Sequence, residues 1–373
     1  MKPLRIMHVI SSLAVGGAER NLLNLVRDNS HPHITHIVVC RRFGGLHQDF
    51  IEAGIELILL DSAKYALYNP LRWREISEIA SLATIYRIDI LHAHCPPSLF
   101  FVPLAARKAK CRCAVSVHAM RKQLTFFEYQ QIFPVKRKVD RYIEGSKGVI
   151  SDLCEAGISP DKIACVPYGV DGALFARNNQ TLRMDFRRSH NINKDAIVAC
   201  RIARFHPQKG FDLLLKMVPE IVDRLPGFRL LLVGDGPEMG SLRKLAKELG
   251  VSEAVIFTGF YLRTEEIYAA SDLVLITARE EALGISQLEA MAAASAFVAY
   301  EVGGLSEVLQ HERNALLIES GDEAGFIDAV ASLAVDESKR WRFGQESLKR
   351  FQQSYSIEAM RNGVVKIYQD IAQ

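Results

Sequence analysis

Short apolar runs alternate along this chain with longer amphipathic segments, and the alternation recurs in both halves. Apolar runs bounded by turn residues predict β-strands, and the longer segments between them predict helices. The predicted strands cover residues 5–10, 36–40, 56–60, 88–92, 113–118 and 163–166 in the first half, and 196–202, 228–233, 255–257, 273–276, 296–300 and 315–318 in the second. Strands that alternate with helices predict a doubly wound α/β architecture, built twice.

A polar, loop-like stretch at residues 177–194 lies between the two halves and is the most plausible hinge. We therefore expect one domain over residues 1–180 and a second over 181–355. A last helix-like segment, 356–371, follows a second domain that is already complete. At 373 residues, with 49% hydrophobic and 24% charged positions, the chain is long enough for two such domains.

Two glutamates lie eight residues apart in the second half, Glu281 and Glu289. Glu281 falls in the loop after the strand at 273–276, and Glu289 falls about one turn into a helix predicted over 285–293. Carboxylates in these places can accept hydrogen bonds from sugar hydroxyls. The alternative is that Glu281 is solvated and that Glu289 lies on an exposed helix face.

A cationic loop precedes the glutamates along the chain. Arg204 and Lys209 lie between the strand at 196–202 and a helix-like segment that begins at Phe211. A guanidinium binds oxyanions bidentately and an ammonium acts as a point charge, so the loop suits a ligand with two adjacent phosphates. Together with the glutamates, it indicates a ligand that is both phosphorylated and rich in hydroxyls.

At this point the sequence resembles the retaining glycosyltransferases of GT-B fold that are called family 4. The matching motifs span nearly the whole chain in the family's order: Gly16-Gly17-Ala18-Glu19, His92-Ala93-His94, His118, Pro167-Tyr168-Gly169-Val170-Asp171 with Phe175, Arg204 with Lys209-Gly210, Val233-Gly234-Asp235-Gly236-Pro237-Glu238, Phe257-Thr258-Gly259, the two glutamates, and Val302-Gly303-Gly304 with Glu307. The resemblance implies two Rossmann-like domains that face each other across a cleft. It also implies that the tail 356–373 crosses back to the first domain.

The resemblance assigns roles to individual residues. Arg204 and Lys209 would stabilise the leaving phosphate of a nucleotide sugar, Glu281 would hold donor-sugar hydroxyls, and His118 would contact the donor sugar or its phosphate. These four form the expected catalytic set. The expected donor-binding set consists of Gly16, Gly17, Gly259, Leu283, Gly284, Ile285 and Glu289. Glu289 would accept both ribose hydroxyls, Gly259 would border the base, and no residue stands out as a covalent nucleophile.

The sequence favours no metal and no other cofactor. It has no Asp-x-Asp motif, and protein cations would neutralise the leaving group instead. His92 and His94 point to one face of a strand and could bind a metal, but hydrogen-bonded polar residues are the preferred interpretation. Gly234-x-Gly236-x-x-x-Gly240 resembles a dinucleotide-binding loop that is one residue too long and contains Pro237, so we interpret it as architectural.

The net charge of +3 hides an asymmetry of roughly +7 up to residue 180 and roughly −4 after it. The excess is concentrated at residues 107–112 and 121–141, and the second stretch adds four exposed-type aromatics, Phe126, Phe127, Tyr129 and Phe133. Such a stretch can hold a protein on an anionic membrane surface; the alternative is a solvated helix that packs on its own core. Nucleic acid is not an expected partner.

The predicted localisation is cytoplasmic, with peripheral contact with the inner face of the cell membrane as a hypothesis. No apolar run is long enough for a membrane span. The start, residues 2–15, is interrupted by polar residues and is interpreted as a strand with its loop, not a signal peptide. Seven cysteines without CxxC pairs fit reduced thiols.

The predicted function is retaining transfer of a hexose-type sugar from a nucleoside-diphosphate sugar, with UDP favoured, to a glycan or lipid-linked acceptor. Lipopolysaccharide or other cell-surface polysaccharide synthesis is the expected context. Ala282 stands where relatives usually have glycine, and Tyr168 where asparagine is common, so donor identity stays open. The alternatives are a GT-B nucleotide-sugar epimerase or phosphorylase, and a non-catalytic sugar-nucleotide scaffold.

Overall fold

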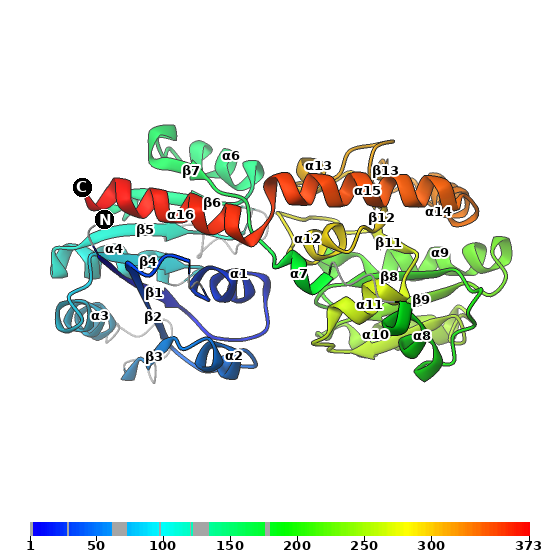
Figure 1. The fold of residues 1–373 in the computed structure, drawn as a ribbon, viewed down its shortest axis with the longest axis horizontal. Coiled ribbons are helices and arrows are strands. Elements are labelled where there is room, and N and C mark those ends of the chain that lie inside the picture. The colour runs from blue at the N-terminus through cyan, green and yellow to red at the C-terminus, as the bar shows by residue number, and fades with distance from the viewer. Residues whose placement is uncertain are drawn as a thin grey trace. The chain divides into compact units, whose positions relative to one another are not determined.

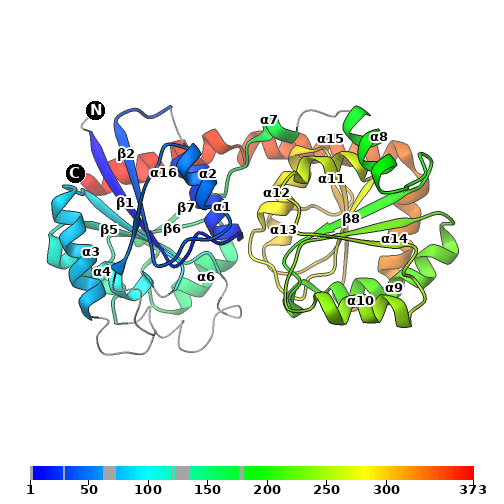
Figure 2. The ribbon, with the colours of Figure 1, turned by 90° about the horizontal axis from the view of Figure 1, so that it is seen from below.

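The computed structural model describes residues 3–27, 30–61, 73–96, 98–119, 121, 134–175 and 180–373. The chain forms two compact units. The first unit contains residues 1–169 together with the last segment, Ile357–Gln373, and the second contains Val170–Ser356. In each unit, helices lie on both faces of a parallel sheet (Figure 1 and Figure 2).

The first unit has a seven-stranded sheet in the order β3-β2-β1-β4-β5-β6-β7. Its strands are β1 (Leu4–Ile10), β2 (Ile34–Cys40), β3 (Glu56–Leu59), β4 (Ile90–His94), β5 (Arg112–Ser116), β6 (Arg141–Glu144) and β7 (Ile163–Cys165). Its helices are α1 (Gly17–Val26), α2 (His47–Glu52), α3 (Trp73–Ile85), α4 (Ser98–Ala109), α6 (Lys147–Glu155) and α16 (Ile357–Ala372), with short 3₁₀ turns η4 (Lys136–Lys138) and η5 (Pro160–Lys162). The strand order reverses between β1 and β4, which is where doubly wound sheets bind ligands.

The second unit repeats this order in a six-stranded sheet, β10-β9-β8-β11-β12-β13. Its strands are β8 (Val198–Ile202), β9 (Arg229–Val233), β10 (Val255–Gly259), β11 (Leu273–Ile276), β12 (Ala296–Tyr300) and β13 (Ala315–Ile318). Its helices are α7 (Gly172–Phe175), α8 (Gln180–Ser189), α9 (Phe211–Arg224), α10 (Met239–Glu248), α11 (Thr264–Ala270), α12 (Ile285–Ala292), α13 (Leu305–Val308), α14 (Glu323–Val335) and α15 (Glu337–Ser354), with the 3₁₀ turn η6 (Pro207–Lys209). Its switch point lies between β8 and β11.

The C-terminal helix α16 is part of the core of the first unit. Its apolar side chains recur every three or four residues, as in an amphipathic helix: Ile357, Met360, Val364, Val365, Ile367, Tyr368 and Ile371. They pack with Leu4, Ile6 and Ile90 of the central strands in one buried cluster. The helix predicted over 356–371 is therefore confirmed, and it closes one face of the first sheet.

The structure corrects the sequence prediction at three places. β4 is Ile90–His94, two residues later than predicted, so both of its histidines lie within the strand. The strand β6 was not predicted, because Arg141 and Glu144 made it read as part of a basic surface stretch. Residues 122–133, which carry the aromatic side chains of that stretch, lie outside the described residues. The polar segment 177–194 was predicted as loop but contains α8; residues 176–179 lie outside the described part.

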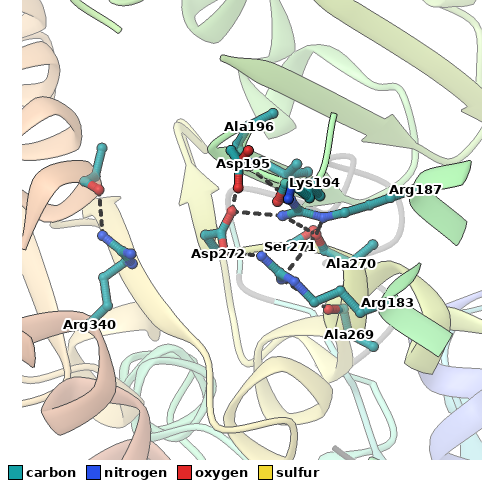
Figure 3. Close-up of polar contacts among 12 residues, drawn as sticks. Arg183, Arg187, Lys194, Asp195, Ala196, Ala269, Ala270, Ser271, Asp272 and Arg340 are labelled. Carbon is teal, nitrogen blue, oxygen red and sulfur yellow. Dashed lines mark hydrogen bonds and ion pairs between the residues drawn. The ribbon is translucent and has the colours of Figure 1, made fainter. Parts of the chain in front are cut away.

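Ion pairs with Asp272, together with the buried Phe186, hold α8 in place. Figure 3 shows Arg183 and Arg187 of this helix pointing at Asp272, the residue before β11. The carboxylate accepts hydrogen bonds from Arg183 at 2.6 Å and from Arg187 at 2.9 Å, and from the amide of Val198 at 2.8 Å. Arg187 also donates to the carbonyl of Ala270. Such a helix has a polar sequence, which explains why the pattern did not predict it.

No helix in the described part of the chain is both long and apolar enough to span a bilayer.

We expect Asp272→Ala to lower the free energy of unfolding of the second unit by about 3 kcal/mol. The substitution leaves the guanidinium of Arg187 without its carboxylate partner, and only 4% of the Arg187 side chain is exposed. Urea unfolding followed by circular dichroism measures the change. The matched control is Arg188→Ala on the same helix, whose pair with Asp185 is exposed and should contribute less than about 0.5 kcal/mol. Equal losses in the two variants would contradict this account of α8.

Candidate active site

The switch point of the second sheet brings two loops together, because β8 and β11 are neighbours. The first loop, after β8, contains η6 and Gly210. The second follows β11 and ends at α12. The hydroxyl of Thr277 donates to the carbonyl of Gly210 at 2.7 Å. Gly210 has φ +66°, and a Cβ there would lie 1.8 Å from the backbone carbonyl oxygen of Thr277, so this close approach requires glycine.

Arg279 joins the same two loops a second time. Its amide donates to the carbonyl of Gln208 at 2.8 Å, and its guanidinium donates to the carbonyl of Pro207 at 2.7 Å. The guanidinium also makes a bidentate pair with Asp212 at 2.8 and 2.7 Å. The pKa of Asp212 is lowered, chiefly by this hydrogen bonding to Arg279. Side chains on the two loops are thereby held in a fixed relation.

Lys209 and Glu281 meet where the loops touch. The ammonium donates to both carboxylate oxygens, at 2.7 and 2.8 Å, although the residues are 72 positions apart. Glu281 is only 5% exposed, as is Glu289 in α12, where the Tyr268 hydroxyl lies 3.4 Å from a carboxylate oxygen. The alternative interpretation, a solvated Glu281 and an exposed Glu289, is therefore wrong.

The other expected donor-binding residues of this unit lie at the end of β10, in the loop after β11 and in the first two turns of α12. Leu283 and Ile285 are buried, and Gly284 caps the amino end of α12 without a side-chain hydrogen bond. A helix amino end with bare amides favours an anion. Gly259 ends β10 with φ +72°. Arg204 is exposed, and among the described residues its guanidinium has no ion-pair partner, so it is accessible to a ligand.

The sequence analysis missed Arg201 in β8. Its guanidinium lies 3.9 Å from Glu281, and the side chain is 1% exposed. Two of its nitrogens have no hydrogen-bond partner in the described part of the chain. A buried cation with unsatisfied donors is costly for stability. Glu281 therefore has two cations, Arg201 and Lys209, within 4 Å. An arginine inside a predicted buried strand was the signal that could have found it.

The remaining expected residues belong to the first unit. Gly16 precedes α1, and Gly17 is its first residue. A Cβ added to Gly17 meets nothing within 4 Å, so packing inside the unit does not explain the glycine, and the space in front of the helix end is open. His118 lies two residues beyond β5, not at its end as predicted, in a left-handed conformation with φ +61°. Strained backbone of this kind gathers at functional sites.

His118 ends a continuous chain of hydrogen-bonded rings that crosses the switch point of the first sheet. The contacts are His36 Nδ1 to His8 Nε2 at 2.9 Å, His8 Nδ1 to His94 Nε2 at 3.0 Å, and His94 Nδ1 to His118 Nε2 at 3.0 Å. His118 Nδ1 then lies 2.8 Å from the Tyr168 hydroxyl. Each of the three inner rings uses both of its nitrogens.

Burial fixes the direction of these hydrogen bonds. It lowers the pKa of His8 and His94 well below the usual range and that of His118 to about 4, so each of these rings carries one proton at neutral pH. A ring with one proton must donate on one side and accept on the other. Burial also raises the pKa of Tyr168, so its hydroxyl keeps a proton, for which His118 is the acceptor among the described residues. Tyr168 therefore donates to His118 Nδ1, and every imidazole after it donates through Nε2.

The same contacts bear on the histidines as metal ligands. Ring nitrogens of His8, His92 and His94 lie within 4.8 Å of one another, close enough to hold one metal ion. His92, however, bonds the Tyr368 hydroxyl at 2.7 Å and the Ser116 hydroxyl at 3.1 Å, and the other two rings are bonded within the chain. A metal would have to break hydrogen bonds of all three rings, so these residues fit the polar-lining interpretation better.

Glu144 holds the backbone beside His118. Its side chain is fully buried and accepts hydrogen bonds from the amides of Val117 at 2.7 Å and His118 at 3.5 Å. Burial raises its pKa to about 8, against these amide contacts. Both ring nitrogens of His118 are also hydrogen-bonded within the first unit, to His94 and Tyr168.

Comparison with known proteins identifies the class of protein that this fold and site define. Residues 15–173 match the family model described as Glycosyltransferase Family 4, and residues 183–350 match that of Glycosyl transferases group 1. The chain is a glycosyltransferase. It belongs to family 4 of the GT-B glycosyltransferases.

Individual proteins agree with this assignment. The chain is 26% identical over 326 residues to an N-acetyl-alpha-D-glucosaminyl L-malate synthase of Bacillus anthracis, covering 82% of this chain and 80% of that protein. It is 34% identical over 231 residues to a GDP-mannose-dependent alpha-(1-6)-phosphatidylinositol monomannoside mannosyltransferase of Mycobacterium tuberculosis. That match covers 57% of this chain and 59% of the mycobacterial protein. The crystal structure of Anabaena HepE with UDP and glucose has a TM-score of 0.89 at 18% identity, over 98% of this chain and 100% of that one, which shows the shared fold.

We expect His8, His94 and His118 to be neutral Nε2–H tautomers, because the direction of the hydrogen bonds starts at Tyr168. Nitrogen NMR of protein with labelled histidine measures the tautomers and the couplings across the N–H···N bonds. Tyr168→Phe should mix the tautomers of all three rings. The control Tyr368→Phe should alter only His92, its hydrogen-bond partner. Nδ1–H signals from the three rings in the unsubstituted protein would contradict the assignment.

Proposed function

We propose that this protein is a retaining glycosyltransferase that moves a hexose-type sugar from a nucleoside-diphosphate sugar, with UDP favoured, to a hydroxyl of a glycan or lipid-linked acceptor. The proposed context is cell-surface polysaccharide or lipopolysaccharide synthesis. One observation carries the proposal: Lys209 and Glu281 are in contact beside the amino end of α12, at the switch point of the second sheet. Cation, carboxylate and helix end together suit a phosphorylated sugar.

Cleavage of the bond between sugar and diphosphate puts negative charge on the leaving phosphate and positive charge on the ring. Arg204 and Lys209 would stabilise the phosphate, each by a few kcal/mol in a site from which water is excluded, roughly the value of one oxyanion-hole donor. The diphosphate would take the ammonium of Lys209 from Glu281. That exchange would free the carboxylate to accept hydrogen bonds from donor-sugar hydroxyls and to face the developing ring cation.

The nucleoside would lie along the carboxyl ends of the neighbouring strands. Glu289, buried in α12, would accept the ribose hydroxyls, and Gly259 at the end of β10 would border the base. Gly17 leaves open space at the amino end of α1, where a donor diphosphate or acceptor could approach the backbone, whereas a Cβ on Gly16 would meet the Glu19 carboxylate. His118 would act by holding the loop after β5, since its nitrogens are bonded internally.

Retention would follow from attack on the same face of the sugar, with the departing phosphate taking the proton of the acceptor hydroxyl. In this mechanism neither Lys209 nor Glu281 acts as a covalent nucleophile. Arg204, Lys209 and the buried Arg201 supply the positive charge that a metal would otherwise provide, which supports the proposal that no metal is essential.

The named relatives support different nucleotides. HepE was solved with UDP and glucose, whereas the mycobacterial relative is named for GDP-mannose. We keep UDP as the favoured nucleotide because the match to HepE covers 98% of this chain and 100% of HepE. The phosphatidylinositol mannoside in the relative's name supports a lipid-linked acceptor here. The anionic membrane surface remains part of the proposal, and Arg121 and Arg137 are exposed basic residues of the basic stretch in the described part of the chain.

We expect Lys209→Ala to abolish turnover while the fold stays intact, because the variant loses the point charge on the leaving phosphate. Release of nucleoside diphosphate, measured with and without acceptor, reports turnover, and circular dichroism reports the fold. The matched control is Lys216→Ala, an exposed lysine on α9 in the same unit, which should keep full activity. Full activity of Lys209→Ala would refute the role of Lys209. Release that needs no acceptor would favour the epimerase alternative, and no release by the unsubstituted protein would favour the scaffold alternative.

We expect UDP-sugars to raise the melting temperature more than GDP- or ADP-sugars in a thermal-shift screen. A ligand present at 100 times its dissociation constant stabilises the folded state by about 2.7 kcal/mol. The shift should be lost in Glu289→Ala, because the ribose would lose its acceptor. A larger shift with GDP-sugars would overturn the choice of base and leave the proposed transfer intact.

A further inference from the structure

The two basic clusters of the first half of the sequence meet in one hollow of the first unit. The hollow has a volume of about 450 Å³, inside the usual range of ligand pockets. Its cationic lining consists of Arg107, Lys110, Arg112, Arg137, Lys138 and Lys162. These residues come from segments up to 55 positions apart along the sequence, and only the fold brings them together.

The hollow lies at the amino ends of the strands. Arg107 is in the last turn of α4 and Lys110 directly follows it, Arg112 begins β5, and Lys162 directly precedes β7. In a parallel sheet the amino ends of all strands lie on one side of the sheet and the carboxyl ends on the other. The five residues of β4 separate these two sides by ~16 Å. The hollow is therefore at the edge opposite to that of Gly17 and His118, and it shares no residue with the candidate active site.

Two carboxylates also line the hollow, and both are engaged in holding backbone. Asp140 accepts from the amide of Cys113 at 2.8 Å and pairs with Arg112 at 3.3 Å. Asp89 accepts from the amide of Arg5 at 2.9 Å. Lys162 donates to the carbonyl of Val139 at 2.9 Å. The six cations and two carboxylates leave an excess of +4 in the hollow.

Four of the six cations are uncommitted in the described part of the chain. Arg107, Lys110, Arg137 and Lys138 make no side-chain hydrogen bond or ion pair with another described residue there. Like charges gathered around one concavity repel one another, and this repulsion is relieved only by an anion or by solvent and salt. Solvated basic patches on a convex surface do not require an anion; here the cations line a common hollow that is partly open to solvent.

We infer that this hollow is a binding site for a phosphate-bearing ligand. Two guanidinium groups can bind phosphate oxygens bidentately, and two or more ammonium groups add point charge, a combination that suits a doubly charged phosphate better than a carboxylate. The volume exceeds that of a single phosphate, so the ligand carries the phosphate on a larger group or carries several. The site does not depend on the proposed donor chemistry, because it lies at the other edge of the sheet.

The same phosphate chemistry has two sources, a soluble phosphorylated compound and the headgroup of an anionic lipid. Binding of tripolyphosphate by calorimetry tests the first, and co-sedimentation with vesicles of phosphatidylglycerol in phosphatidylcholine tests the second. The variants are Arg107→Glu and Arg137→Glu. The control is Lys108→Glu, which makes the same change in net charge on the same helix, but Lys108 donates to the Ser77 hydroxyl at 2.8 Å and does not line the hollow.

We expect at least one probe to bind, and each hollow variant to weaken that binding about tenfold, the effect of losing one charge-assisted hydrogen bond. The control should change it less than about twofold, since only long-range charge is altered. Tripolyphosphate alone binding would assign a soluble ligand, and vesicles alone a headgroup. Equal weakening by all three reversals, or no binding of either probe, would overturn the inference. Nucleotide release should stay unchanged in Arg107→Glu, which belongs neither to the candidate active site nor to the proposed membrane-contacting stretch, so failure here and failure of the proposed function are distinguishable.

Discussion

The candidate site depends on the contact between two loops of the second unit. The Thr277 hydroxyl reaches the carbonyl of Gly210, and Arg279 bonds Pro207, Gln208 and Asp212. Without these bonds, Lys209 and Glu281 would be side chains on separate loops. With them, a cation and a carboxylate are placed 2.7 Å apart in a nearly buried position, and a diphosphate can exchange with the carboxylate. Glycine at position 210 is what allows the approach.

The repeated α/β fold could be predicted from the sequence because strand-length apolar runs were separated by amphipathic segments. The helix α16 was predictable for the same reason. The strand β6 and the helix α8 were not, since charged residues flank or outnumber their few buried apolar side chains. Tyr142 and Ile143 of β6 lie between Arg141 and Glu144, and Phe186 of α8 precedes Arg187, which bonds Asp272. Periodicity reports apolar burial, so short elements with few apolar residues and buried charges escape it.

The candidate site was predictable in part. The glycosyltransferase assignment followed from ordered motifs, and the loop positions of Lys209 and Glu281 followed from the strand pattern. Sequence reasoning could not anticipate that both nitrogens of His118 are used internally, because the ring chain combines residues from β1, β2 and β4. An arginine inside a predicted buried strand marks Arg201 as unusual, but only the structure shows that it approaches Glu281. The partners of a buried charge and the use of both ring nitrogens are properties of packing between elements.

The last helix has a consequence for how the protein is made. Residues of α16, Tyr368 among them, are synthesised after the whole second unit, yet they complete the core around Leu4 and Ile6, which are synthesised before it. The second unit is contiguous and can fold as soon as it has emerged. The sheet of the first unit must wait, with one apolar face uncovered, until α16 has emerged. During synthesis the second unit would therefore be complete before the first.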